Sequence, residues 1–198
     1  MNLDYKKIIE DFRITYRTFE QYESRVWGAE GNMIELYKQV GELVACYNNQ
    51  SPQLADEVLD VIAQMIRLCD FYEFDIEAIF EASIKICDNS NETAVAQTIF
   101  SIVEHVGILS KYIMMEEKYY FRSRVDEPSY MISNEKFIEC ISNIISLALS
   151  IAKEKNIDLN ETNINTRKID QEWFPKIEEQ EKIYLLKLEQ KKTPKSVY

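Results

Sequence analysis

The stretch SPQLADEVLDVIAQMIRLCDFYEF, residues 51–74, decides the class of fold. Ser51 is a favoured residue for a helix N-cap, and Pro52 fits the first turn of a helix. The segment that follows is apolar around most of its circumference, which is typical of a helix that is largely buried. We therefore predict a central helix that reaches about Phe74. Its apolar residues are Leu54, Val58, Leu59, Val61, Ile62, Met65, Ile66, Leu68 and Cys69.

Further helices are predicted on both sides of this segment, because apolar residues return there at spacings of three and four. Before it, we expect helices over Leu3–Trp27, ended by Gly28 and Gly31, and over Met33–Tyr47. After it, we expect a helix from an N-cap at Asp75 through Ile86, and two more over about 92–120 and 134–155. Asn156 would be the next C-cap, Asp158 would open a new segment, and a final helix would cover 169–190.

The composition agrees with an all-α fold and excludes several classes of protein. The chain has 198 residues, 46% of them hydrophobic, and only four Gly and four Pro, too few for the many tight turns of a β-sandwich or barrel. A formal net charge of −11 repels a phosphate backbone, so we expect no nucleic acid polymer as a partner. The four cysteines stand singly in apolar stretches, and no run of 18 apolar residues occurs. We therefore expect a cytoplasmic protein that does not span a membrane.

A faint internal similarity suggests two related helical repeats. VGEL at 40–43 matches VGIL at 106–109, an offset of 66, and FDIE at 74–77 matches IDLN at 157–160, an offset of 83. We interpret these matches as a diverged tandem duplication, although chance similarity between amphipathic helices is the alternative. The expected division is a first repeat over 1–88, a degenerate second repeat over 89–172, and a C-terminal helix and tail over 173–198.

A polar stripe crosses the buried central helix. Glu57, Asp60, Gln64 and Arg67 are spaced three or four residues apart and therefore lie on one face. Buried carboxylates are costly unless they are neutralised. The candidates for neutralisation are Arg67, a cation from another helix, or a metal ion.

The preceding helix offers a facing acidic stripe. Glu35, Gln39 and Glu42 share one face, Lys38 flanks them, and Gly41 permits close approach of the two helices. Antiparallel packing would bring Glu35, Glu42, Glu57 and Asp60 toward one another, and a hard divalent cation such as Mg²⁺ would relieve their repulsion. The alternative is that these acids are ordinary solvated surface residues.

These residues carry a family resemblance. IELYKQVGELVACY followed by QLADEVLDVIAQMIRLCDFYEFDIEAIFE resembles the MazG-like branch of the all-α nucleoside triphosphate pyrophosphohydrolases, over residues 27–88. Members of that branch typically show Glu-Glu-x-x-Glu on one helix and Glu-x-x-Asp on the next, and they use Mg²⁺ to cleave a nucleoside triphosphate into monophosphate and pyrophosphate. Glu57 and Asp60 match the second motif and Glu42 the end of the first, whereas Lys38 and Gln39 replace the two leading glutamates.

The resemblance implies a helical bundle of MazG-like type and an altered magnesium site. The implied metal ligands are Gln39, Glu42, Glu57 and Asp60, and Glu35 or Glu42 would activate the attacking water. Lys38, Arg67, Lys118 and Arg122 are the candidates for binding the triphosphate. The alternatives are a non-catalytic protein that binds nucleotides or a partner through the same cleft, and a plain helical assembly module.

The second repeat lacks an equivalent acidic site. The two offsets map the five acidic-site positions to Ser101, His105, Ile108, Cys140 and Asn143, none of which is a carboxylate. We therefore expect this copy to act as a scaffold. It would form a pseudo-dimer with the first repeat within one chain, unless two chains form a homodimer through the first repeat.

Overall fold

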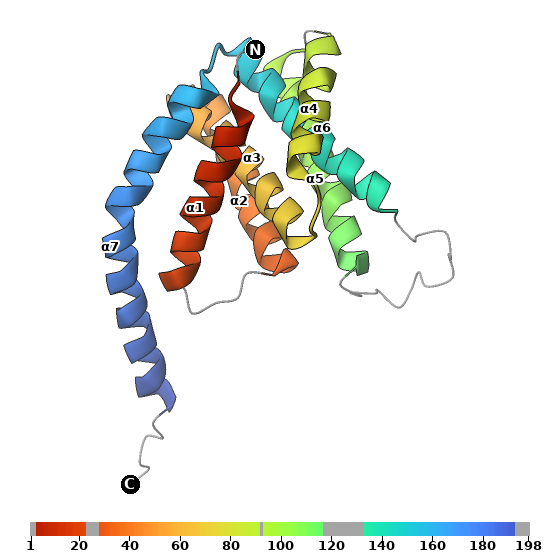
Figure 1. Ribbon diagram of the computed structural model, residues 1–198. Coiled ribbons are helices and arrows are strands. Elements are labelled where there is room, and N and C mark those ends of the chain that lie inside the picture. Colours follow the sequence, from red (N-terminus) through yellow and green to blue (C-terminus); the bar gives the residue numbers. More distant parts are fainter. Residues whose placement is uncertain (1–2, 23–27, 92, 117–132, 193–198) are drawn as a thin grey trace.

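The computed structural model describes residues 3–22, 28–91, 93–116 and 133–192, and within these residues the secondary structure consists of helices, without any strand (Figure 1). The all-α class is therefore confirmed. None of the described helices combines the length and apolarity needed to cross a membrane. The helices are α1 (Tyr5–Tyr22), α2 (Ala29–Asn48), α3 (Leu54–Phe71), α4 (Ile76–Asn89), α5 (Val95–Glu116), α6 (Asn134–Glu154) and α7 (Leu159–Lys192).

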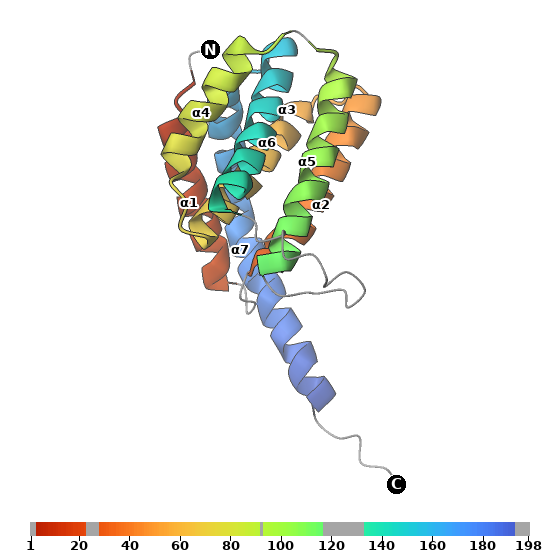
Figure 2. The same ribbon diagram turned by 90° about the vertical axis from the view of Figure 1, so that its right-hand side faces the viewer.

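The helices form a bundle around α3 and α6. Helix α3 packs against α2 and helix α6 against α5, while α3 and α6 also contact each other. The outer helices are exchanged between the halves of the chain, because α4 packs on α6 and α7 packs on α3. Helix α1 lies along α7 and α3, and the second half of α7 extends beyond the bundle (Figures 1 and 2).

The central helix predicted from the sequence is deeply buried. Its side chains from Val58 to Met65 include six hydrophobic residues with 1% exposure or less. Helix α6 is covered in the same way from Ile141 to Ala152. Apolar side chains around a whole helix can be satisfied only by neighbours on every side, which α2, α6 and α7 provide for α3.

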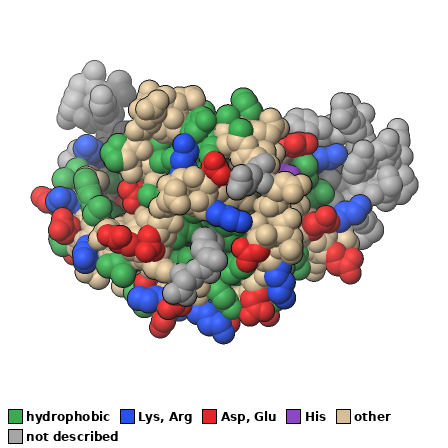
Figure 3. Space-filling model, turned by 90° about the horizontal axis from the view of Figure 1, so that it is seen from above, with side chains coloured by type: hydrophobic (Ala, Val, Ile, Leu, Met, Phe, Trp, Pro, Cys, Tyr) green, Lys and Arg blue, Asp and Glu red, His purple; other side chains and the backbone are tan. Residues whose placement is uncertain are grey.

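Charged side chains lie on the face of the bundle seen in Figure 3. There, acidic and basic side chains are interspersed with apolar ones, and no single basic patch dominates.

Three helices end in the same way. Gln50, Glu73 and Asn156 have φ angles of 52°, 57° and 53°, in the left-handed region. In each case the next residue donates its N–H to a carbonyl five positions earlier: Ser51 to Cys46 O, Phe74 to Cys69 O and Ile157 to Ala152 O. This is the Schellman motif, which satisfies carbonyls that the helix end leaves unpaired. The expected C-cap at Asn156 thus lies at the left-handed position just beyond the end of α6.

Helix starts agree with some sequence predictions and correct others. Asp75 caps α4, since its carboxylate accepts a hydrogen bond from the backbone N–H of Ala78 at 3.1 Å. Gly31 was expected to end the first helix, but it lies inside α2, because a glycine with helical dihedrals costs only about 1 kcal/mol and does not terminate a helix.

The two segments expected after Asp158 form one continuous helix, α7. Pro175 lies inside it and is exposed, so the carbonyl that its missing N–H leaves unpaired can be solvated by water. Helix α7 therefore runs through the boundary expected at residue 173.

The two halves of the chain bury equivalent positions. At the offset of 66, Met33, Leu36, Val40 and Leu43 of α2 correspond to Ile99, Ile102, Val106 and Leu109 of α5, and all eight are buried. At the offset of 83, Glu73 and Asn156 share the left-handed conformation, and Asp75 and Asp158 both accept hydrogen bonds from the first turn of the next helix. The halves thus have the same order of buried faces and helix ends.

Replacing Glu73 by glycine should stabilise the protein, because glycine adopts positive φ without the steric cost that a Cβ atom brings. We expect Glu73→Gly to raise the free energy of unfolding by about 0.5–1 kcal/mol in urea denaturation. Asn156→Gly is the matched variant and should gain less, since asparagine tolerates this conformation better. A loss of stability in Glu73→Gly would contradict the strain argument.

Candidate functional site

The predicted acidic residues lie on two helices that pack against each other. Glu35, Gln39 and Glu42 belong to α2, and Glu57 and Asp60 to α3. Gln39 is buried, and its side-chain oxygen Oε1 has no hydrogen-bond partner within the described residues. Oε2 of Glu57 is buried and equally unpartnered within the same residues. Two oxygen acceptors at this helix pair are therefore left unsatisfied.

Lys38 is the positively charged residue that α2 places near the acidic residues. Its Nζ lies 2.6 Å from Oε1 of Glu35, and Gln39 donates a hydrogen bond to the same oxygen at 3.3 Å. Burial opposes the charge on Lys38, but the bond to Glu35 and the nearby charges of Glu35, Glu42 and Asp60 raise its pKa above the usual value. The ammonium group that replaces a glutamate of the family motif thus supplies positive charge to the acidic cluster.

The α3 side holds two carboxyl groups that are hard to ionise. Burial and the charge of Glu57 raise the pKa of Asp60 to about 7, against the pull of Arg167. Burial and the charges of Glu42 and Asp56 likewise raise the pKa of Glu57. Such paired acids with raised pKa values cost stability and are found at functional sites more often than elsewhere.

The cation beside Asp60 comes from a helix that sequence reasoning did not connect to the site. Arg167 of α7 is the positive charge that lowers the pKa of Asp60. Arg67, the candidate on α3 itself, instead bonds Glu20 of α1 at 3.0 Å and places its guanidinium 5.5 Å from the Tyr16 ring centre. The structure thus brings cations from two other helices to Asp60, Arg167 from α7 and Lys38 from α2.

The acidic residues do not form a ready-made metal cluster. Within the described ranges, no group of three or more His, Cys, Asp or Glu residues lies close enough together to hold a metal ion. The donors present are nevertheless hard oxygens, and Mg²⁺ commonly takes only one or two carboxylates together with water and substrate phosphates. Glu57, Asp60 and the unsatisfied amide oxygen of Gln39 fit that limited ligand set.

Two predicted substrate-binding residues, Lys118 and Arg122, lie outside the described residues.

The positions of the second half that correspond to the acidic site carry no carboxylate. There, Nδ1 of His105 lies 2.8 Å from the carbonyl oxygen of Ser101, and the thiol of Cys140 lies 3.2 Å from the carbonyl oxygen of His105. Ser101 and His105 correspond to Glu35 and Gln39 of α2, and Cys140 corresponds to Glu57 of α3.

Comparisons of the chain with models of known protein families, with curated proteins and with solved structures found no match.

Asp60→Asn should stabilise the protein at alkaline pH. The folded-state pKa of about 7 lies above the usual value of 3.8, so the native state loses stability as the pH rises from about 4 through 7. Because asparagine does not ionise, the variant should exceed the native protein in free energy of unfolding at pH 8. We expect a gain on the order of 2 kcal/mol, after discounting for the partial exposure of Asp60, and little gain at pH 4.

The check is urea denaturation at both pH values. Asp88→Asn, at the exposed end of α4, is the matched control for loss of a surface carboxylate. An Asp60→Asn gain of equal size at pH 4 and pH 8 would show that ionisation of Asp60 is not its source.

Proposed function

We propose that this protein is a magnesium-dependent nucleotide pyrophosphohydrolase of MazG-like type, which converts a nucleoside triphosphate into monophosphate and pyrophosphate. The observation that carries the proposal is the pair Glu57 and Asp60 on α3, which are partly buried and have raised pKa values, together with the unsatisfied oxygen of Gln39 on the packed helix α2. A packed helix bundle gains nothing from retaining such groups, because apolar residues at the same positions would be more stable.

A magnesium ion with its nucleotide would remove this cost. Glu57 and Asp60 would hold the ion through carboxylate oxygens, with Gln39 contributing its amide oxygen and Glu42 a further carboxylate. When bound, the ion would neutralise the charge that develops on the phosphates during the reaction. The ionised form of Asp60 is the one that this role requires, so activity should rise as the pH passes through about 7.

Glu42 is the better candidate for activating the attacking water. Oε1 of Glu35 already accepts hydrogen bonds from Lys38 and Gln39, so this oxygen is occupied by two donors. Glu42 is exposed on α2 and acts electrostatically on both Glu57 and Lys38. Lys38 and Arg67 would contact the phosphates as the charge-bearing groups on α2 and α3.

We propose further that the chain arose by tandem duplication and works as a pseudo-dimer within one chain. The shared burial order and the shared helix-end geometry at the offsets of 66 and 83 support a common origin of the halves. The exchange of α4 and α7 between the halves supports a scaffold role for the second repeat, because α7 covers α3 and supplies Arg167 beside Asp60.

The proposed location is the cytoplasm. The free cysteines Cys46, Cys69, Cys87 and Cys140 suit its reducing conditions.

The test is pyrophosphate release from a panel of canonical and modified nucleoside triphosphates with Mg²⁺. We expect turnover by the native protein and a loss of at least about a hundredfold in Asp60→Ala, since removal of a metal-binding carboxylate typically costs this much. Asp88→Ala is the matched control and should keep full activity. Absence of turnover on every substrate, or turnover that Asp60→Ala leaves unchanged, would end the proposal.

The Lys38–Glu35 ion pair favours a second candidate, a protein that binds nucleotides or a partner without hydrolysing them. Lys38 places an ammonium group where the family motif has a carboxylate, and its charge reduces the need for a metal. A site neutralised in this way can bind a ligand and still lack the means to activate water.

Restoring the motif distinguishes the two candidates. The double variant Lys38→Glu with Gln39→Glu recreates Glu-Glu-x-x-Glu at 38–42 and should bind Mg²⁺ at least about tenfold more tightly in calorimetric titration. If the native site is catalytic, both proteins release pyrophosphate. If it is a binding descendant, only the double variant does so, or neither does. An unchanged Mg²⁺ affinity would show that this helix pair is not a metal site.

A further inference from the structure

A pocket of about 300 Å³ lies between α1 and α7. Its lining includes Arg167, which is also the cation that acts on Asp60. Three cations line it, Lys7 from α1 and Arg167 and Lys168 from α7. Ile14, Ile164 and Phe174 form apolar walls. The pocket therefore combines positive charge with surface for an apolar group, in a chain whose net charge is −11.

The α7 face beside this pocket is unusually polar for a packed helix. It carries Asn163, Thr166, Arg167 and Asp170, and Asn163 is 1% exposed. The positions 83 residues earlier, on α4, are Phe80, Ser83, Ile84 and Cys87, and they pack against α6. The corresponding helix thus packs on α6 with mainly apolar residues. Helix α7 instead meets acidic residues of α3, because Thr166 bonds Asp56 at 2.9 Å and Arg167 acts on Asp60.

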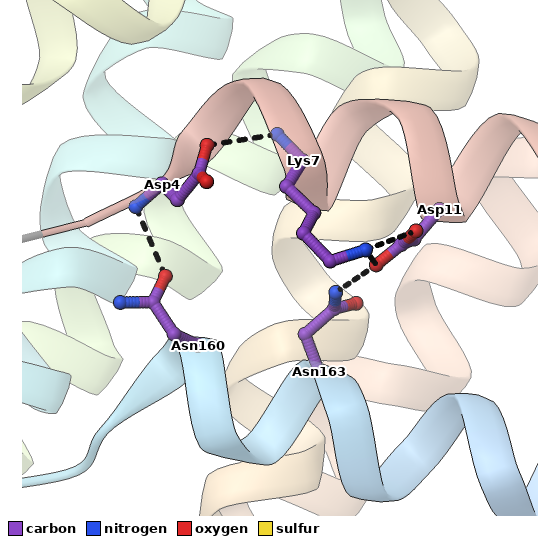
Figure 4. Close-up of polar contacts among 5 residues, drawn as sticks. All are labelled: Asp4, Lys7, Asp11, Asn160 and Asn163. Atoms are coloured by element: carbon purple, nitrogen blue, oxygen red, sulfur yellow. Dashed lines mark hydrogen bonds and ion pairs between the residues drawn. The ribbon is translucent and has the colours of Figure 1, made fainter.

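These polar groups are only partly satisfied. Asn163 donates a hydrogen bond to Asp11 at 2.7 Å, and Lys7 bonds the same carboxylate at 2.9 Å (Figure 4). Within the described residues, however, Oδ1 of Asn163 and Nε of Arg167 are buried without a hydrogen-bond partner. Buried polar atoms are nearly always hydrogen-bonded, so unsatisfied ones beside a pocket indicate that a partner is missing.

Arg167 is held in place at the wall of the pocket. Its guanidinium lies 4.5 Å from the ring centre of Phe12, and Nη1 lies 2.8 Å from Oδ2 of Asp170. That contact is an ion pair without hydrogen-bond geometry, since neither atom has a hydrogen-bond partner within the described residues. A guanidinium fixed in this way loses little conformational freedom when it binds an anion.

The charges at the pocket leave an excess of positive charge. Lys7 is paired with Asp11 and Arg167 with Asp170, while the lining residue Lys168 is exposed and has no ion pair within the described part of the chain. Thr15 and Gln171 also line the pocket and add hydrogen-bond donors. Several donors converging from two helices suit the three terminal oxygens of a phosphate monoester better than the two of a carboxylate.

We propose that the α1/α7 pocket binds a small phosphate monoester, with the phosphate at Arg167 and Lys168 and an apolar group against Ile14, Ile164 and Phe174. The pocket shares Arg167 with the surroundings of Asp60, but binding there needs neither magnesium nor turnover. The ligand supplies the partner that Nε of Arg167 lacks within the described residues.

The test is calorimetric titration of the full chain with phenyl phosphate, in low salt with EDTA. Omitting Mg²⁺ keeps this result independent of the hydrolase proposal. We expect one site, with weaker binding of inorganic phosphate and of benzoate and no binding of phenol, because both the phosphate and the ring contribute. Lys168→Glu should weaken binding by about tenfold and Arg167→Gln by more, through loss of charge-assisted hydrogen bonds.

Controls separate binding from folding. Lys136→Glu, an exposed change near the start of α6, matches Lys168→Glu in charge and should bind as the native protein does. Lys168 is itself exposed, so its variant tests the site even if Arg167→Gln unfolds in circular dichroism. The proposal is overturned if phenyl phosphate does not bind, if Lys168→Glu binds it as well as Lys136→Glu does, or if benzoate or inorganic phosphate binds as tightly.

Discussion

The contact between α3 and α6 is the constraint on which the rest of the structure depends. Both helices are apolar around most of their circumference, so each needs neighbours on all sides. Each receives a hairpin partner from its own half and an outer helix from the other half. The acidic residues of α2 and α3, and the polar face of α7, are placed by this arrangement.

Local patterns predicted the helices whose faces are strongly apolar. Helix α3 followed from its buried periodicity, and the start of α4 from the capping preference of Asp75. The continuity of α7 was not predicted, because its sequence is polar near the start and contains Pro175, and both features normally argue for a break. Only packing against α1 and α3 supports a helix there.

The candidate site could be predicted only in part. Facing stripes on α2 and α3 follow from spacing within each helix, and the structure places those helices together. The electrostatic effect of Arg167 on Asp60 joins residues far apart in the chain, and no local pattern signals it. The Lys38–Glu35 bond was within reach of sequence reasoning, since residues three apart on a helix are neighbours.

The exchange of outer helices has a consequence for how the chain can be divided. A cut in the polar connection between α4 and α5 would sever no helix, but it would leave α3 without α7 and α6 without α4. Each fragment would then expose apolar side chains of its central helix, α3 or α6, to water. The two pieces would therefore regain their native form only by assembling with each other, as complementary parts of a split protein do.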